Sequence, residues 1–206
     1  MTAYVTDAKQ VRWALPRPVA WRLEYTAGVP CDSFWLRCVW DENNTTRPED
    51  WVGFTAEYQG ERVFTGVVDE CEVSVTGQGR LLELSGRGMA ALLLDNEALG
   101  QDYQVATQLD IIRDHVQPYG ISVASKGKLP PVSQFSVSTG SSEWSVVYEF
   151  ARYYGGVAPR FDREGRLVLT GWDDSEERVV DDSVPLISLV RRDKRYGVLS
   201  QVMIRD

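Results

Sequence analysis

Apolar and polar residues alternate in short runs over the first part of the chain, which is the pattern of strands with one buried face. Such runs lie at residues 21–25, 34–39, 52–58, 62–69, 70–76 and 81–85. In the second run, Phe34, Leu36 and Cys38 share the predicted buried face. The last two runs flank a glycine turn at 77–79, as hairpins require. The pattern predicts an antiparallel meander over residues 1–86, which is expected to curl into a small barrel or sandwich.

The pattern changes to helical spacing after the glycine-marked segment 86–88. Residues 89–94 are apolar and favour a helix. Thr107 and Asp110 fit a capping box loosely and predict the start of a second helix. Its buried face is expected to hold three apolar residues, Leu109, Ile112 and Val116.

A third helix is predicted over residues 143–154, because apolar residues recur there at helical spacing: Trp144, Val147, Tyr148 and Ala151. A hairpin follows, with strands at 157–161 and 166–170. Two more strands are predicted, at 186–192 and 198–205. The sequence therefore predicts a β-rich α+β protein with three parts: residues 1–86, 87–185 and 186–206.

The composition of the chain limits the kinds of molecule that it is expected to bind. The chain has 206 residues and a net charge of −8. An acidic protein gains nothing from counterion release on nucleic acid, so nucleic-acid binding is not expected, and the charge is interpreted as an aid to solubility. No signal-peptide pattern is found at the N-terminus, and no apolar run approaches the about 18 residues of a membrane span. We expect a soluble protein made in the cytoplasm.

The residue types that usually carry chemistry are few and scattered. Cys31, Cys38 and Cys71 form no CxxC pair, and His115 is the only histidine, so no metal site or other cofactor is expected. We predict His115 on a helix surface near the helix C-terminus, with no nucleophile motif beside it.

Two further patterns have a plain interpretation. Acidic pairs such as Asp69 and Glu70 are adjacent in the chain, whereas glycoside hydrolysis needs carboxylates facing each other across a cleft. The segment 85–88 lacks both phosphate-loop patterns and is interpreted as a turn from sheet to helix. We therefore expect no catalytic residues in this chain.

Tryptophans are concentrated in the first part of the chain, at Trp13, Trp21, Trp35, Trp40 and Trp51. Such a density suits either a sugar-binding face or aromatic anchors of the core and of subunit contacts. Trp35 and Trp40 lie off the predicted buried face, so we predict them at a subunit interface.

Several segments, taken in order, resemble the baseplate hub proteins of phage and prophage tails, a group that includes the phage Mu tail protein P and the late control protein D. The matching segments are residues 66–69 (GVVD), 86–88 (GRG), 94–95 (LD), 119–121 (YGI), 135–155 and 161–170 (FDREGRLVLT). Each is short, and the resemblance rests on their order and spacing over about residues 52–206.

The resemblance implies a fold and an assembly. It implies a tail-tube-like antiparallel barrel in residues 1–86, an inserted mixed α/β domain in 87–185, and return strands in 186–206 toward a second barrel. It also implies a homotrimeric ring that joins the tail tube to the tip or spike. Because hub proteins usually continue into that second barrel, we expect a piece of a longer protein, a partner polypeptide that supplies the rest, or a short member.

The favoured hypothesis is therefore a non-enzymatic hub component of a phage or prophage tail, assembled in the bacterial host and located in the virion tail. Its expected partners are further copies of itself, the tube protein and the tip or spike protein. The alternative is a carbohydrate- or receptor-binding tail module that uses the tryptophan-rich part. A cell-wall hydrolase is a third hypothesis. It requires a catalytic pair of carboxylates or a Cys/His pair, and we find neither in the sequence.

Overall fold

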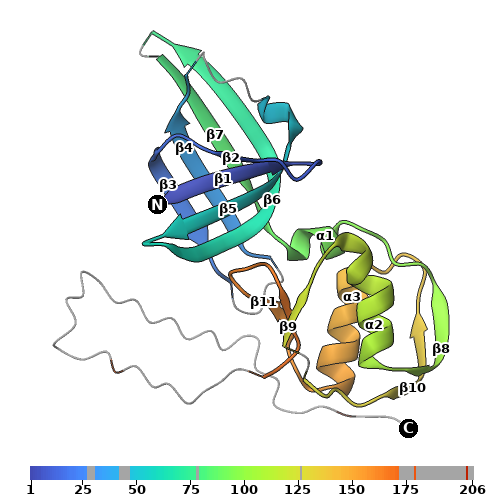
Figure 1. The fold of residues 1–206 in the computed structure, drawn as a ribbon. Coiled ribbons are helices and arrows are strands. Elements are labelled where there is room, and N and C mark those ends of the chain that lie inside the picture. Colours follow the sequence, from blue (N-terminus) through green and yellow to red (C-terminus); the bar gives the residue numbers. More distant parts are fainter. Residues whose placement is uncertain are drawn as a thin grey trace. The chain divides into compact units, whose positions relative to one another are not determined.

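A computed structural model describes residues 1–26, 31–41, 47–77, 79–125 and 127–171, together with Val179 and Met203 (Figure 1). The chain divides into two compact units, Met1–Gly171 and Trp172–Asp206. The strands predicted at 186–192 and 198–205 lie outside the described residues.

The first part of the chain forms one antiparallel sheet. Its strands are β1 (Thr2–Asp7), β2 (Arg12–Ala14), β3 (Pro18–Glu24), β4 (Ser33–Val39), β5 (Trp51–Tyr58), β6 (Glu61–Thr76) and β7 (Gly79–Gly88), with the short helix η1 (Pro48–Asp50) before β5. The order across the sheet is β2-β1-β5-β6-β7-β4-β3. The hairpins from β5 through β7 confirm the predicted meander. No pairing joins β2 to β3 among the described residues, so the sheet has two edges and does not close by hydrogen bonds.

The sheet buries one face around an aromatic core. Phe34, Leu36 and Cys38 are each at most 3% exposed, which confirms their predicted face. The rings of Phe34 and Phe54 stack with centroids 3.8 Å apart. The core also holds Ala3, Val5, Leu15, Trp51, Ala56, Phe64, Leu82 and Leu84.

The second part is mixed in structure. In chain order it holds α1 (Ala90–Leu94), β8 (Gln101–Ala106), α2 (Gln108–His115), η2 (Gln117–Tyr119), β9 (Val123–Ser125), β10 (Val132–Val137), α3 (Glu143–Tyr148), η3 (Glu149–Tyr154), β11 (Arg160–Phe161) and β12 (Leu167–Val168). β8 pairs antiparallel with β10, and β12 lies between β11 and β9 in a small sheet. α2 and α3 lie beside the β8–β10 pair (Figure 1). Together the two parts confirm a β-rich α+β fold.

The second part has its own hydrophobic core, separate from that of the large sheet. It contains residues from α1, α2, α3 and η3 and from strands such as β10 and β12, among them Leu93, Ile111, Ile112, Val116, Phe135, Trp144, Val147, Phe150 and Leu167. The predicted boundaries between the parts remain predictions.

The helices follow the sequence pattern with two differences. The capping box is confirmed, since Thr107 accepts from the Asp110 amide and Asp110 accepts from the Thr107 amide. The predicted face of α2 is partly wrong, because Leu109 is 65% exposed while Ile111 is buried. The buried stripe is shifted because α2 packs against α3 as well as the strands. The third helix has the predicted extent, but its second half, η3, is a π-helix.

No helix among the described residues is long and apolar enough to cross a membrane.

Candidate assembly surface

β2 and β3 are the two edge strands of the large sheet. Among the residues that the structure describes, β3 pairs only with β4, and β2 pairs only with β1. On β3, Val19 is 61% exposed and Trp21 is 48% exposed. Unpaired edges with apolar side chains favour pairing with another chain. The sheet therefore offers two surfaces suited to contacts between subunits.

Trp35 lies on β4, on the face opposite Phe34 and Leu36. Its indole Nε1 donates to Glu83 Oε2 over 3.2 Å. Arg37 donates from Nε to Glu83 Oε1 over 2.8 Å and places its guanidinium carbon 5.4 Å from the centroid of the Trp35 ring. The half-buried indole is thus held in one orientation on the outer face. Its predicted interface role stays a prediction.

Trp40 packs against the core of the sheet, and its ring lies 5.7 Å from the Trp51 ring in an edge-to-face arrangement. The sequence interpretation that placed Trp40 off the core is therefore wrong. Residue 40 continues the alternation of Phe34, Leu36 and Cys38, and its amide still bonds to the Arg80 carbonyl oxygen of β7 over 3.0 Å. A subunit contact through Trp40 is still a prediction.

Arg87 lies near the end of β7, just before α1 begins. Its guanidinium donates to both oxygens of Asp69 over 2.7 and 2.9 Å, and to both oxygens of Asp95 over 3.0 and 2.6 Å. Hydrogen bonds from Arg87 hold the pKa of Asp95 below its usual value. The interactions with Asp69 and Asp95 raise the pKa of Arg87. The glycine-rich segment 85–88 belongs to β7, and its one cation is engaged by two carboxylates.

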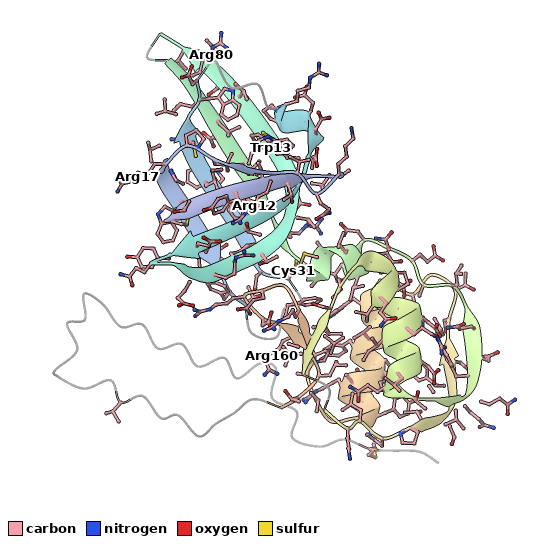
Figure 2. The ribbon with its side chains drawn as sticks, in the orientation of Figure 1. Arg12, Trp13, Arg17, Cys31, Arg80 and Arg160 are labelled. Atoms are coloured by element: carbon pink, nitrogen blue, oxygen red, sulfur yellow. The ribbon has the colours of Figure 1, made fainter. Side chains whose placement is uncertain are left out.

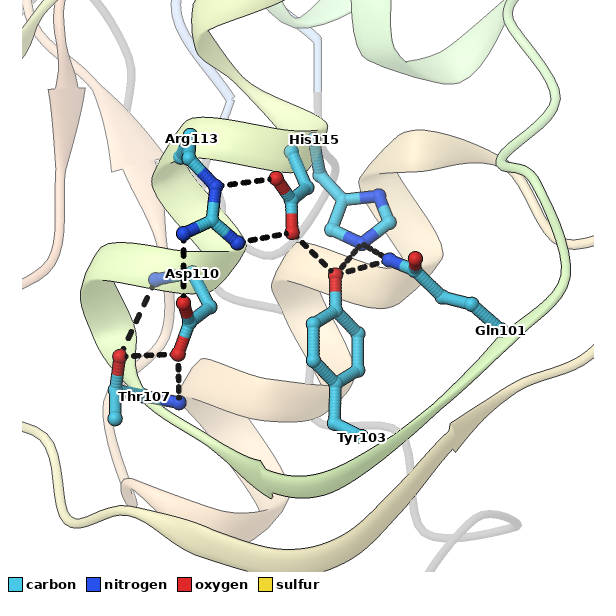
Figure 3. Close-up of polar contacts among 7 residues, drawn as sticks. Gln101, Tyr103, Thr107, Asp110, Arg113 and His115 are labelled. Atoms are coloured by element: carbon cyan, nitrogen blue, oxygen red, sulfur yellow. Dashed lines mark hydrogen bonds and ion pairs between the residues drawn. The ribbon is translucent and has the colours of Figure 1, made fainter.

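His115 was expected on a helix surface, and that prediction is wrong. The side chain is buried, and its Nδ1 donates to Oε2 of the equally buried Glu143 over 2.6 Å. Nε2 lies 3.0 Å from the hydroxyl of Tyr103 (Figure 3). Tyr119 donates to the other oxygen of Glu143 over 2.9 Å. The sequence gives no signal for this pair, because its two members are 28 residues apart.

The residues around His115 extend the network to the surface. Tyr103 donates to Asp114 Oδ2 over 2.9 Å, and Gln101 also contacts the Tyr103 hydroxyl. Burial, and then the hydrogen bond with Asp114, raises the pKa of Tyr103. The hydrogen bonds of His115 with Glu143 and Tyr103 join α2 to α3 and β8. Because His115 and Glu143 are only 2% and 6% exposed, the cluster offers little access to a substrate.

The cysteines are free thiols. Burial raises the pKa of Cys38 to about 11, and burial with the nearby Glu49 does the same for Cys71. Within the described ranges, no group of three or more His, Cys, Asp or Glu side chains could hold a metal ion.

Comparison with known proteins shows which proteins the chain is similar to. The family model described as "Baseplate hub protein gp44-like, second domain" matches residues 90–171, the region from α1 to just past β12. This match and the structural neighbours confirm the resemblance of the chain to phage baseplate hub proteins. No curated protein matches the chain in sequence.

Solved structures share the fold over most of this chain. A tail protein from Neisseria meningitidis MC58 is 20% identical with a TM-score of 0.66, over 86% of this chain and 53% of that one. The 43 kDa tail protein of prophage MuSo2 from Shewanella oneidensis is 20% identical with a TM-score of 0.61, over 82% and 54%. Prophage tail protein gp18 from Listeria monocytogenes EGD-e is 11% identical with a TM-score of 0.52, over 82% and 50%. The chain thus spans about half the length of the structures it matches, and it shares the fold of these tail proteins.

Proposed function

We propose that this chain is a component of a phage or prophage tail baseplate hub, in which three copies form a ring that joins the tail tube to the tip or spike. The observation that carries the proposal is a sheet whose edge strands, β2 and β3, each lack a second partner among the described residues, next in sequence to a region that matches a hub domain. Because sheet edges pair readily between chains, edge-to-edge contacts are a physical route to a closed ring.

Within this proposal the three predicted parts keep their roles. Residues 1–86 correspond to a tail-tube-like barrel, 87–185 to an inserted domain, and 186–206 to return strands toward a second barrel. The two separate hydrophobic cores support a division close to the start of α1. The remaining half of the length of the matched structures would come from more of the same protein or from a second polypeptide.

The proposed partners are other copies of the chain, the tube protein and the tip or spike protein, in a virion tail assembled in the host cytoplasm. The role is structural rather than enzymatic, which the descriptions of the matched proteins support. Trp35 and Trp40 are the proposed aromatic contacts. Trp35 is the stronger of the two, since its indole is already fixed on the outer face by Glu83.

Two measurements test this function. Light scattering after size exclusion should give a trimer, and gold-labelled antibodies against the chain should mark one end of the tail in particles of the phage that encodes it. Trp35→Ala should weaken self-association, whereas Tyr58→Ala, which removes an aromatic ring exposed at 48% on β5, should not. A chain that stays monomeric and is missing from tails would contradict the proposal.

A second candidate function, a carbohydrate- or receptor-binding tail module, is favoured by one observation. A pocket lies at β3 and β4 and is lined by two tryptophans together with charged side chains.

A further inference from the structure

The pocket beside the free edge of the sheet has a volume of about 490 Å³. Its lining comes from two paired strands, with Trp21, Arg22 and Glu24 from β3 and Ser33, Phe34 and Trp35 from β4. This volume lies within the range of pockets that hold small ligands. The contacts proposed for a ring do not require such a cavity.

The polar groups of the pocket form an organised set. Arg22 Nη2 donates to Glu24 Oε1 over 2.5 Å, and the Ser33 hydroxyl donates to Glu24 Oε2 over 3.2 Å. The carboxylate is therefore held through both oxygens, yet the Arg22 and Glu24 side chains stay 72% and 47% exposed. A guanidinium and a carboxylate in contact present several donors and free acceptor lone pairs side by side. Neighbouring hydroxyl groups, each both donor and acceptor, match that arrangement.

The aromatic side chains add an apolar surface to the polar groups of the pocket. Trp35 is oriented by its bond to Glu83 and by the guanidinium of Arg37 near its ring. Trp21 lies opposite Leu36, on the other face of the sheet, so its indole does not face the same ligand. Indoles are rigid apolar plates that lose little conformational entropy on binding. They suit a ligand with an apolar C–H face and a hydroxylated rim, which describes a sugar ring.

We propose that this pocket binds a neutral oligosaccharide, with the indole of Trp35 against a sugar ring and the Arg22–Glu24 pair bonded to its hydroxyl groups, since Arg22 and Trp35 lie directly opposite each other on the same face. Neutrality follows from charge balance, since the lining carries one cation and one anion that already compensate each other. The inference rests on the second candidate function and is independent of the hub role. Tail labelling tests the hub role and saccharide titration tests the pocket, so either can fail alone.

The test is a nuclear magnetic resonance titration of the full chain with tri-N-acetylchitotriose and with maltotriose, both neutral. The indole N–H signal of Trp35 should shift with a dissociation constant on the order of 1 mM or tighter. The signal of Trp144, a core residue of α3, should not move and serves as an internal control. The indole signals are assigned by replacing each tryptophan with phenylalanine.

Paired variants locate the site. Glu24→Gln and Trp35→Ala should weaken binding by about tenfold or more, which is about 1.4 kcal/mol. Glu57→Gln, at the Arg12–Glu57 ion pair of 2.9 Å, and Tyr58→Ala are the matched controls and should bind as the wild type does. Circular dichroism checks that each variant folds, and Glu24→Gln carries the test if Trp35→Ala does not.

The proposal is overturned by three results. The first is no indole shift with either saccharide up to about 10 mM, a concentration far above the expected dissociation constant. The second is an equal loss of binding in the control variants. The third is a clear preference for a charged saccharide such as sialyllactose over the neutral ones.

Discussion

Phe34 on β4 lies directly opposite Gly86 on β7, and its ring occupies the space that a side chain at Gly86 would need. A Cβ at Gly86 would stand 2.0 Å from the Val67 carbonyl oxygen and 2.6 Å from the Phe34 ring. Phe54 on β5 lies opposite Gly66 on β6, where a Cβ would stand 2.1 Å from the Arg87 carbonyl oxygen and 2.8 Å from the Phe64 ring. The aromatic core of the sheet therefore depends on two glycines in neighbouring strands.

This packing makes Gly86→Ala a destabilising change. Backbone and ring must both move, and overpacking of this kind typically costs about 1–3 kcal/mol. Chemical denaturation of the purified chain measures the loss. Gly77→Ala is the control, because a Cβ there meets nothing within 4 Å. Equal stability of the two variants would show that the close approach of β6 and β7 is not needed.

The buried pair of His115 and Glu143 should be strongly coupled. Removing one partner leaves the other buried without its hydrogen bond, so His115→Ala and Glu143→Ala should each cost about 3–5 kcal/mol. The double variant should cost less than the sum of the two, with a coupling of about 1–3 kcal/mol. Glu149→Ala, at an exposed carboxylate of η3, is the control. Strict additivity in this cycle would mean that the pair does not stabilise the fold as a unit.

Arg87 should contribute stability that depends on pH. The pKa of Asp95 is lowered in the folded state, so its interaction with Arg87 is present above the unfolded value of 3.8 and is lost as the pH falls further. Arg87→Met should therefore destabilise the chain at pH 7 by about 1 kcal/mol, because exposed ion pairs are worth little individually. The gap to the wild type should narrow below about pH 4.

Thermal unfolding at pH 7 and pH 3 measures that gap. Arg22→Met is a control, since it removes an arginine paired with one carboxylate instead of two. A gap that is constant across this range would contradict the assigned pairing of Arg87 with Asp95.

The cysteines should be poor nucleophiles in the folded chain. With their pKa values near 11, Cys38 and Cys71 hold only about 0.1% of the reactive thiolate at pH 8. Iodoacetamide should therefore modify them far more slowly than a free cysteine, and mass spectrometry of digested samples reports each site. In urea all three cysteines should react at the ordinary rate. Fast labelling of Cys38 in the native chain would show that the sheet core opens.

Local patterns in the sequence were sufficient for much of the secondary structure. Alternation placed Phe34, Leu36 and Cys38 on the buried face, and Thr107 with Asp110 marked the start of α2. Such features depend on neighbours within a few residues, which the sequence displays directly. The order of short motifs was also enough to indicate the resemblance to hub proteins, which the comparisons confirm.

Contacts between residues that are far apart in the sequence could not be predicted from such local patterns. His115 is buried because Glu143, far along the chain, reaches it from α3, and no spacing rule links the two. The edge-to-face contact of Trp40 with Trp51 likewise joins residues from different parts of the sheet. The sequence by itself determined the β-rich α+β class and its capping and turn residues, since these follow from local backbone and side-chain preferences. Only the tertiary structure decided that β2 and β3 are the edges of the sheet within the described residues, that Phe34 covers Gly86, and that Arg22 lies opposite Trp35, because each of these depends on which distant strands become neighbours.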